Sequence, residues 1–139
     1  MTPEFFDELV ESFRKEEDKI LLFKRGEYAR SEDRLENFRD VANLVGLKPS
    51  QIALIYLLKH VQSIAQQVMT ESYTWAWFIE DNKEGLKQRV ADAVNYLHLM
   101  AACLESETLV VRSGAIDASK ISTAHDYESG WVIPEGGPK

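Results

Sequence analysis

The sequence predicts an all-α protein: a bundle of four main helices followed by an extended, mostly irregular C-terminal arm. Two observations carry this prediction. Apolar residues recur every three or four positions in four successive segments, which is the period of a helix with one buried face. Residues that favour helix ends border these segments, with Ser31 and Ser50 suited to begin a helix and Gly26 and Gly46 suited to end one. After Ser106 the period is lost.

The first two helices carry both signals. Thr2 suits an N-cap and Pro3 suits the first helical turn, so the first helix is expected to begin at Pro3, and Gly26 either ends it or marks a turn. Its apolar residues are Phe6, Leu9, Val10, Phe13, Ile20 and Leu21. The second helix is expected between Ser31 and Gly46. Its buried stripe comprises Leu35, Phe38, Val41, Ala42 and Val45.

The third helix is expected to begin at Ser50, and it is apolar around most of its circumference until Lys59. Such a helix belongs in the middle of a bundle or at a dimer interface, and a cation buried within it needs a partner. Asp81 and Glu84 suit a capping box that starts the fourth helix, which includes residues 88–105. The apolar stripe of that helix comprises Val90, Val94, Leu97, Ala101 and Leu104.

Aromatic residues are concentrated just before the fourth helix, at Tyr73, Trp75, Trp77 and Phe78, with Ile79 beside them. Two interpretations stay open. These side chains either cap one end of the bundle core, or they form a wall against which a planar base or a partner subunit packs.

The sequence divides into a helical bundle domain, residues 1–106, and an extended C-terminal arm, residues 107–139. Within the arm, Thr108–Arg112 is β-prone but too short to form a stable strand alone. The rest is aperiodic and ends in a segment rich in Pro and Gly. Trp131, Val132 and Ile133 are the residues expected to attach the arm to its own bundle or to a neighbour.

The composition is that of a soluble globular protein, and the net charge of -7 with a pI near 5.0 argues against non-specific nucleic-acid binding. The single cysteine, Cys103, cannot form an internal disulfide and is expected to be a small buried residue. The N-terminus is acidic where a signal peptide is basic, and no apolar run reaches the length of a membrane span. A cytoplasmic location with no membrane association is therefore expected.

Two polar residues interrupt the apolar pattern of the fourth helix. Asp92 and Asn95 lie three positions apart and therefore on one face, as a satisfied structural pair or as half of a site. No glycine-rich phosphate loop, nucleophile elbow or zinc motif is present in the sequence. The polar residues that could complete a site are Lys24, Tyr28, Asp33, Glu36, Asn37, Lys59, His60 and Tyr96. Such an oxygen-rich set suits Mg²⁺, which takes one or two carboxylates together with substrate phosphates, while lysines hold phosphate.

Four short motifs follow one another along the helices. They are Lys24-xxx-Tyr28, Glu36-Asn37-Phe38, Leu58-Lys59-His60 and Asp92-xx-Asn95-Tyr96-Leu97. Together they resemble the nucleotide modification associated domain, found in small phage and bacterial proteins and related to the MazG-type all-α nucleotide pyrophosphohydrolases. The resemblance implies a dimerising helical bundle, Mg²⁺ held by helix-borne acids, and hydrolysis between the α and β phosphates of a nucleotide. Asp92 matches the acid of the family's last metal-binding helix, whereas Arg89 stands where the family has a glutamate.

This resemblance leads to the first of two hypotheses, a Mg²⁺-dependent nucleoside triphosphate pyrophosphohydrolase or a nucleotide-modification factor. Glu36 and Asp92 are then the catalytic residues and the metal ligands. The substrate-binding residues are Lys24, Tyr28, Asn37, Lys59, His60, Asn95 and Tyr96. The second hypothesis is a non-catalytic helical interaction protein, either a phage-type inhibitor of a host factor or an assembly subunit. The expected partners are a small-molecule nucleotide and further copies of the chain, as a homodimer or higher homo-oligomer, in the host cytoplasm if phage-encoded.

Overall fold

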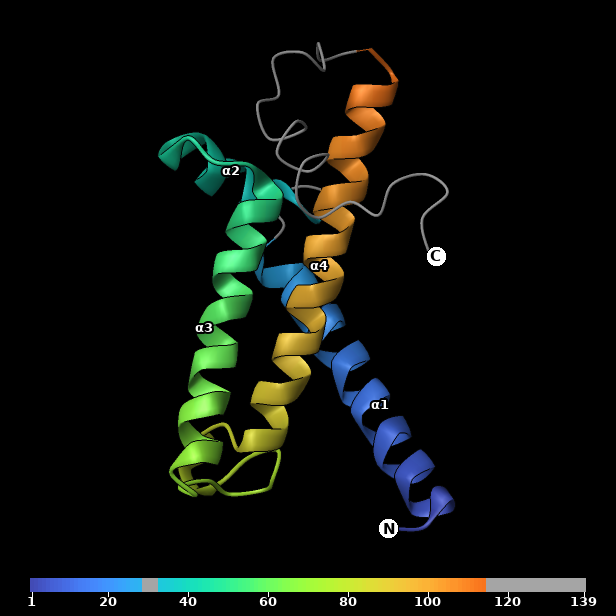
Figure 1. Ribbon diagram of the computed structural model, residues 1–139, viewed down its shortest axis with the longest axis vertical. Coiled ribbons are helices and arrows are strands. Elements are labelled where there is room, and N and C mark those ends of the chain that lie inside the picture. Colours follow the sequence, from blue (N-terminus) through green and yellow to red (C-terminus); the bar gives the residue numbers. More distant parts are fainter. Residues whose placement is uncertain (29–32, 115–139) are drawn as a thin grey trace, which may run out of the picture. The chain divides into compact units, whose positions relative to one another are not determined.

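The computed structural model describes residues 1–28 and 33–114, and the side chains of 1–25 and 33–114. This part of the chain confirms the predicted all-α fold with four main helices (Figure 1). The elements are α1 (Pro3–Tyr28), α2 (Glu36–Val45), α3 (Pro49–Met69), the 3-10 turn η1 (Glu80–Asn82) and α4 (Leu86–Arg112). The chain divides into two compact units, Met1–Cys103 and Leu104–Lys139, and the core and the pockets belong to the first.

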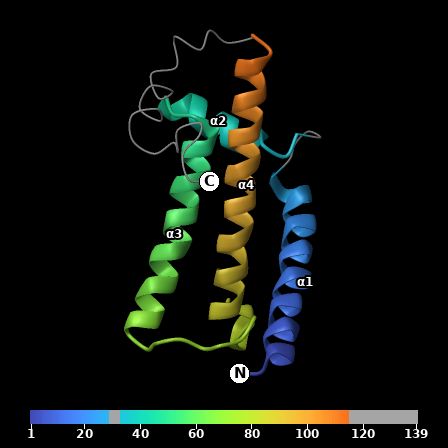
Figure 2. The same ribbon diagram turned by 45° about the vertical axis from the view of Figure 1, so that its right-hand side comes forward.

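In the first unit α4 lies between α1 and α3, as the views in Figures 1 and 2 agree. Side-chain bonds join α4 to both neighbours. The Arg89 guanidinium donates to the Ser63 hydroxyl on α3 at 2.9 Å, and Lys24 of α1 contacts Asp92. The first unit is therefore organised around the N-terminal half of α4.

The hydrophobic core forms where α2 crosses the start of α3. The two helices meet at 99°, and the turn between them places Gly46 in the left-handed region at φ 72°. Phe38 and Ala42 of α2 pack there against Ile52 and Ala53 of α3 and against Cys103 of α4. The prediction that the cysteine is a small buried residue is confirmed, since only 1% of it is exposed.

Two helices begin differently from the prediction. The second helix begins at Glu36 rather than after Ser31, because the Asp33 carboxylate accepts a hydrogen bond from the Leu35 backbone N–H at 3.0 Å and forms a turn there. Ser31 itself lies outside the described residues. The third helix begins at Pro49, one residue before Ser50, so the serine lies in the first turn instead of capping the helix.

Backbone carbonyls, rather than a capping box at Asp81 and Glu84, receive the first N–H groups of α4. Leu86 and Lys87 donate to the carbonyls of Thr74 and Ala76 at 3.0 and 3.2 Å. The segment before the helix thus folds back over its first turn and satisfies donors that have no partner within the helix. The close approach requires Gly85, since a Cβ atom there would lie 2.1 Å from the Ala76 oxygen.

The aromatic segment packs on α1. The ring centroids of Trp75 and Trp77 lie 6.1 and 4.8 Å from that of Phe13, and the Lys87 ammonium lies 5.6 Å from both indole rings. Tyr73 and Trp75 nevertheless remain 49% exposed, and Phe78 52%. The segment therefore closes one end of the first unit and also presents aromatic surface to solvent.

The β-prone run Thr108–Arg112 is helical, which corrects the expectation of an extended arm beginning at residue 107. The physical reason is that extending an existing helix gains one hydrogen bond per residue, whereas a strand without a partner gains none. The Thr108 hydroxyl also donates to the Leu104 carbonyl at 2.8 Å within the helix. The remaining arm, including Trp131, Val132 and Ile133, lies outside the described residues.

The third helix is not enclosed by the other helices. Five of its apolar residues remain between 41% and 53% exposed, namely Leu54, Ile55, Leu58, Val61 and Val68. Its predicted place in the middle of the bundle is therefore wrong for the single chain. Among the described helices none is by itself long and apolar enough to cross a membrane, although the bent pair α2 and α3 together meets that criterion by length and composition.

Candidate functional site

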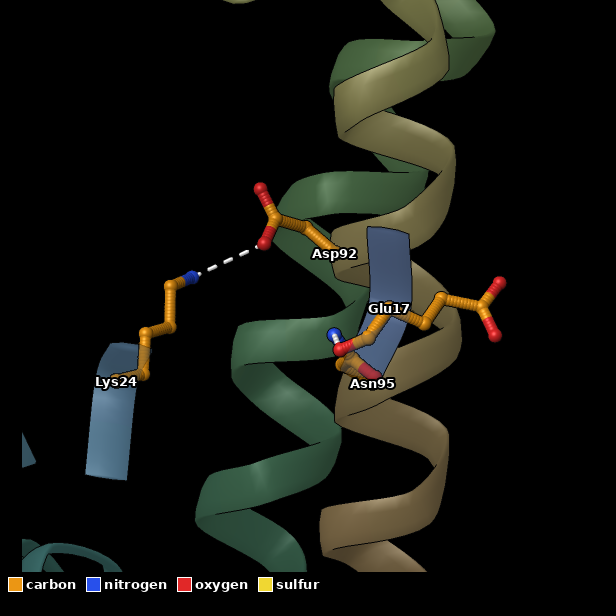
Figure 3. Close-up of polar contacts among 4 residues, drawn as sticks. All are labelled: Glu17, Lys24, Asp92 and Asn95. Carbon is orange, nitrogen blue, oxygen red and sulfur yellow. Dashed lines mark hydrogen bonds and ion pairs between the residues drawn. The ribbon is translucent and has the colours of Figure 1, made fainter. Parts of the chain in front are cut away.

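The centre of the candidate site is an ion pair between α1 and α4. Asp92 is 2% exposed, and its Oδ1 atom lies 3.0 Å from the Lys24 ammonium (Figure 3). A carboxylate removed from water to this degree needs a charged or hydrogen-bonding partner. The Lys24 side chain is 32% exposed, so its stem reaches the buried carboxylate while part of it still faces solvent.

Asn95 lies one turn further along α4 and is 3% exposed. Its Nδ2 donates to the backbone carbonyl of Glu17 on α1 at 3.1 Å (Figure 3). Its Oδ1 accepts no hydrogen bond from the residues that the structure describes. Asn95 therefore fastens α4 to α1 through one side of the amide and retains an acceptor on the other.

Tyr96 and His60 form a ring pair between α4 and α3. Their ring centroids are 4.9 Å apart with an interplanar angle of 29°, and the Lys24 ammonium lies 5.8 Å from the centroid of the Tyr96 ring. Burial lowers the pKa of His60 from its usual value of 6.5; the Asp92 carboxylate opposes this shift and the Lys24 ammonium adds to it. The imidazole is therefore neutral near pH 7.

Beside these residues lies a pocket that we call the basic pocket, with a volume of about 70 Å³. Its polar lining consists of Lys24, Arg25, Arg34, Asn37, Asn95 and Tyr96, and its apolar lining of Ile20, Leu21, Phe38 and Leu99. Arg25 and Arg34 are exposed and form the rim, whereas Phe38 and Asn95 are buried and form the floor. Three cations thus surround one pocket in a chain whose net charge is -7.

Most of the predicted site residues meet in this region. Lys24, Asn37, Asn95 and Tyr96 line the basic pocket, His60 stacks on Tyr96, and Asp92 contacts Lys24. Lys24 also reaches Tyr96, so side chains from α1, α3 and α4 are brought together. Convergence of polar groups from separate helices, inferred from sequence, is thereby observed for these six residues.

Three predicted residues are placed differently. Glu36 is half-buried at the start of α2 but is not part of the basic pocket lining. Lys59 is exposed, which corrects the expectation that it is buried and paired. It lies on the same solvent-facing side of α3 as Leu58, whereas the next residue, His60, faces Tyr96. The side chain of Tyr28 lies outside the described residues.

Sequence reasoning missed Arg25 and Arg34. Both lie near the connection between the first two helices, one beside Lys24 and one beside Asp33. Basic residues on both sides of a short connection in an acidic chain were the signal that could have identified them. The structure shows that they form the rim of the basic pocket.

The surroundings of Asp92 argue against the predicted magnesium site. The Asp92 carboxylate is buried and already paired with the Lys24 ammonium. A positively charged ammonium at this distance would repel a divalent cation bound to the same carboxylate. Among the side chains of residues 1–25 and 33–114, no three from His, Cys, Asp or Glu are grouped so as to hold a metal ion. A role for Glu36 and Asp92 as joint metal ligands therefore has no geometric support here.

The fold and the site define a class of protein: an all-α protein with a buried Lys24–Asp92 pair beside a small basic pocket. No protein-family model, curated protein or solved structure matches the chain. The resemblance to the nucleotide modification associated domain accordingly stays a prediction.

Proposed function

We propose that the protein binds a small anionic ligand with a planar ring, of the nucleotide class, at the basic pocket. The observation that carries the proposal is the position of Lys24, Arg25 and Arg34 around a pocket whose wall includes the Tyr96 ring. Lysine and arginine bind phosphate oxygens, and an aromatic face offers flat contact area to a base. The chain as a whole is negatively charged and repels anions, so this basic rim is a local surface that attracts them.

The pocket volume indicates how such a ligand would bind. About 70 Å³ is well below the ~300–1,000 Å³ usual for sites that enclose a whole ligand. Its floor is apolar with amide groups, and its arginines lie at the rim. We therefore place the ring inside, where the unpaired Asn95 oxygen accepts an N–H from its edge, and the phosphates outside at Arg25 and Arg34.

Replacing Arg34 with alanine tests the proposal. The loss of one charge-assisted phosphate contact is expected to weaken binding of ATP, GTP, CTP or UTP by about tenfold, measured by calorimetry. Arg14→Ala is the matched control, because Arg14 is also exposed but is not part of the pocket lining. Absence of binding to all four nucleotides, or equal losses in the two variants, would reject the proposal. Binding that persists in EDTA is expected, since no metal ligands are invoked.

Nucleotide pyrophosphate hydrolysis is the second candidate activity. It is favoured by the convergence of His60, Asp92, Asn95 and Tyr96 near the basic pocket, and opposed by the pairing of Asp92 with Lys24. The same nucleotide panel with Mg²⁺ or Mn²⁺ distinguishes the candidates. Pyrophosphate release that is lost in Asp92→Asn supports an enzyme, whereas binding without release supports a binding protein.

Self-association is part of the proposed function, as a homodimer or higher homo-oligomer. The exposed apolar residues Leu54, Leu58 and Val61 recur at helical spacing on one side of α3, and a stripe of this kind is typical of a helix that packs against another helix. Leu58→Glu is expected to lower the mass observed by light scattering to that of a monomer, because burying an unpaired charge is costly. Leu22→Glu, on an exposed residue of α1, is the control. A parent protein that is already monomeric contradicts this part of the proposal.

A further inference from the structure

A second, larger cleft lies beside the basic pocket and shares Ile20 and Lys24 with it. We call it the acidic cleft; its volume is about 400 Å³, and Phe23, Phe78, Glu84, Gln88 and Asp92 contribute to its lining. The volume lies in the range of pockets that bind small molecules. The nucleotide proposal makes no use of this cleft.

The charges in the acidic cleft are not balanced. Lys24 pairs with Asp92 at 3.0 Å, and Lys19 pairs with Glu16 at 3.3 Å, so both lysines of the lining are engaged by carboxylates. The remaining carboxylate, Glu84, is exposed and has no ion pair within the part of the chain that the structure describes. One excess negative charge therefore faces the cleft.

Gln88 provides an independent indication of a ligand. It is 6% exposed, it lines the cleft, and its Oε1 accepts no hydrogen bond from any described residue. Leaving a buried acceptor unpaired is energetically costly, so such atoms usually receive a hydrogen bond. What completes this site must donate a hydrogen bond.

Two aromatic rings border the same cleft. Phe23 is 70% exposed and Phe78 is 52% exposed, so both rings are accessible to a ligand in the cleft. An aromatic face attracts an organic cation through its quadrupole and also packs against an aliphatic stem. A hydrated metal ion would gain neither contact.

We propose that the acidic cleft binds a small organic cation that carries a primary ammonium or guanidinium group on an aliphatic stem. Its N–H groups donate to the Gln88 oxygen and to the Glu84 carboxylate, and its stem packs against Phe23 and Phe78. Such a ligand neutralises the excess negative charge, donates a hydrogen bond to the unpaired Gln88 oxygen and covers the exposed rings. The two sites share Lys24, but each can be tested by itself, because Arg34 lines only the basic pocket and Glu84 lines only the acidic cleft.

Calorimetric titration with two cations of different chemistry tests the proposal. Agmatine has N–H donors at both ends, whereas tetramethylammonium has the charge but no donor. Agmatine is expected to bind about tenfold more tightly or better, because it alone can donate to Gln88 and Glu84. Equal affinities, or no agmatine binding, overturn the proposal. Binding of a lysine-rich or arginine-rich peptide in place of agmatine also overturns it.

Variants locate the binding. Glu84→Gln and Gln88→Leu are each expected to weaken agmatine binding by about tenfold, since each removes one acceptor. Glu80→Gln removes the same charge from an exposed residue outside the lining and is expected to have no effect. Circular dichroism confirms that each variant is folded, and Arg34→Ala should bind agmatine like the parent. Unchanged affinity in both cleft variants contradicts the assignment, even if the nucleotide proposal holds.

Discussion

Replacing Lys24 with methionine is expected to reduce the free energy of unfolding by about 3 kcal/mol. The variant leaves the Asp92 carboxylate, which is 2% exposed, without the ammonium that now lies 3.0 Å away. Removing one partner of a buried ion pair usually costs about 3–5 kcal/mol. We expect the lower end of this range, because the Lys24 side chain is 32% exposed and water can partly take the place of its ammonium group. Urea titration followed by far-UV circular dichroism measures the loss.

A double variant separates the ion pair from other effects. Lys24→Met with Asp92→Leu removes both charges and keeps apolar volume, so its stability is expected to exceed that of Lys24→Met alone. Lys15→Met is the control, because Lys15 contacts Glu11 at 3.8 Å in an exposed pair and should change stability by less than about 1 kcal/mol. If Lys24→Met and Lys15→Met cost the same, the pair does not hold α1 to α4.

This pair also shows what sequence could and could not predict. The helical period and the interruption at Asp92 are visible in the sequence. The period led to the correct fold, and the interruption drew attention to a carboxylate that the structure shows to be buried. Its partner lies 68 positions away on α1, and no periodicity specifies which lysine reaches it. The sequence therefore suggested Asp92 as a metal ligand, whereas the structure pairs it with Lys24.

The rotation of α3 was not predictable for a related physical reason. Its sequence is apolar around most of its circumference, so the pattern does not indicate which side faces the other helices. Lys59 and His60 are adjacent, and neighbouring residues on a helix point about 100° apart. The histidine stacks on Tyr96 and the lysine faces solvent, so only one of the two contributes to the candidate site.

The start of α4 was mispredicted because its caps are backbone atoms. Asp81 and Glu84 have the residue types of a capping box, but the donors of Leu86 and Lys87 find carbonyl groups of the preceding segment instead. Every residue has a backbone carbonyl, so the sequence does not indicate which carbonyls act as caps. Gly85 is the residue whose type reflects this contact, because its lack of a Cβ atom lets the two backbone segments approach.

Gly85→Ala is accordingly expected to destabilise the protein by about 3 kcal/mol. The new Cβ would lie 2.1 Å from the Ala76 oxygen and 2.7 Å from its carbonyl carbon, so the backbone must separate. That movement weakens the bonds from Gly85 to Trp77 at 2.8 Å and from Lys87 to Ala76 at 3.2 Å. Urea titration gives the stability, and tryptophan fluorescence reports the displaced aromatic segment.

Gly46→Ala is the matched control for this prediction. Gly46 has a φ of +72°, and an added Cβ there meets nothing within 4 Å, so the substitution incurs only conformational strain of about 1 kcal/mol. The Gly85 variant must therefore lose distinctly more stability than the Gly46 variant, together with a change in tryptophan emission that the Gly46 variant lacks. If the two losses are equal and the emission is unchanged, the aromatic segment does not cap α4, and the N–H groups of its first turn must be satisfied in another way.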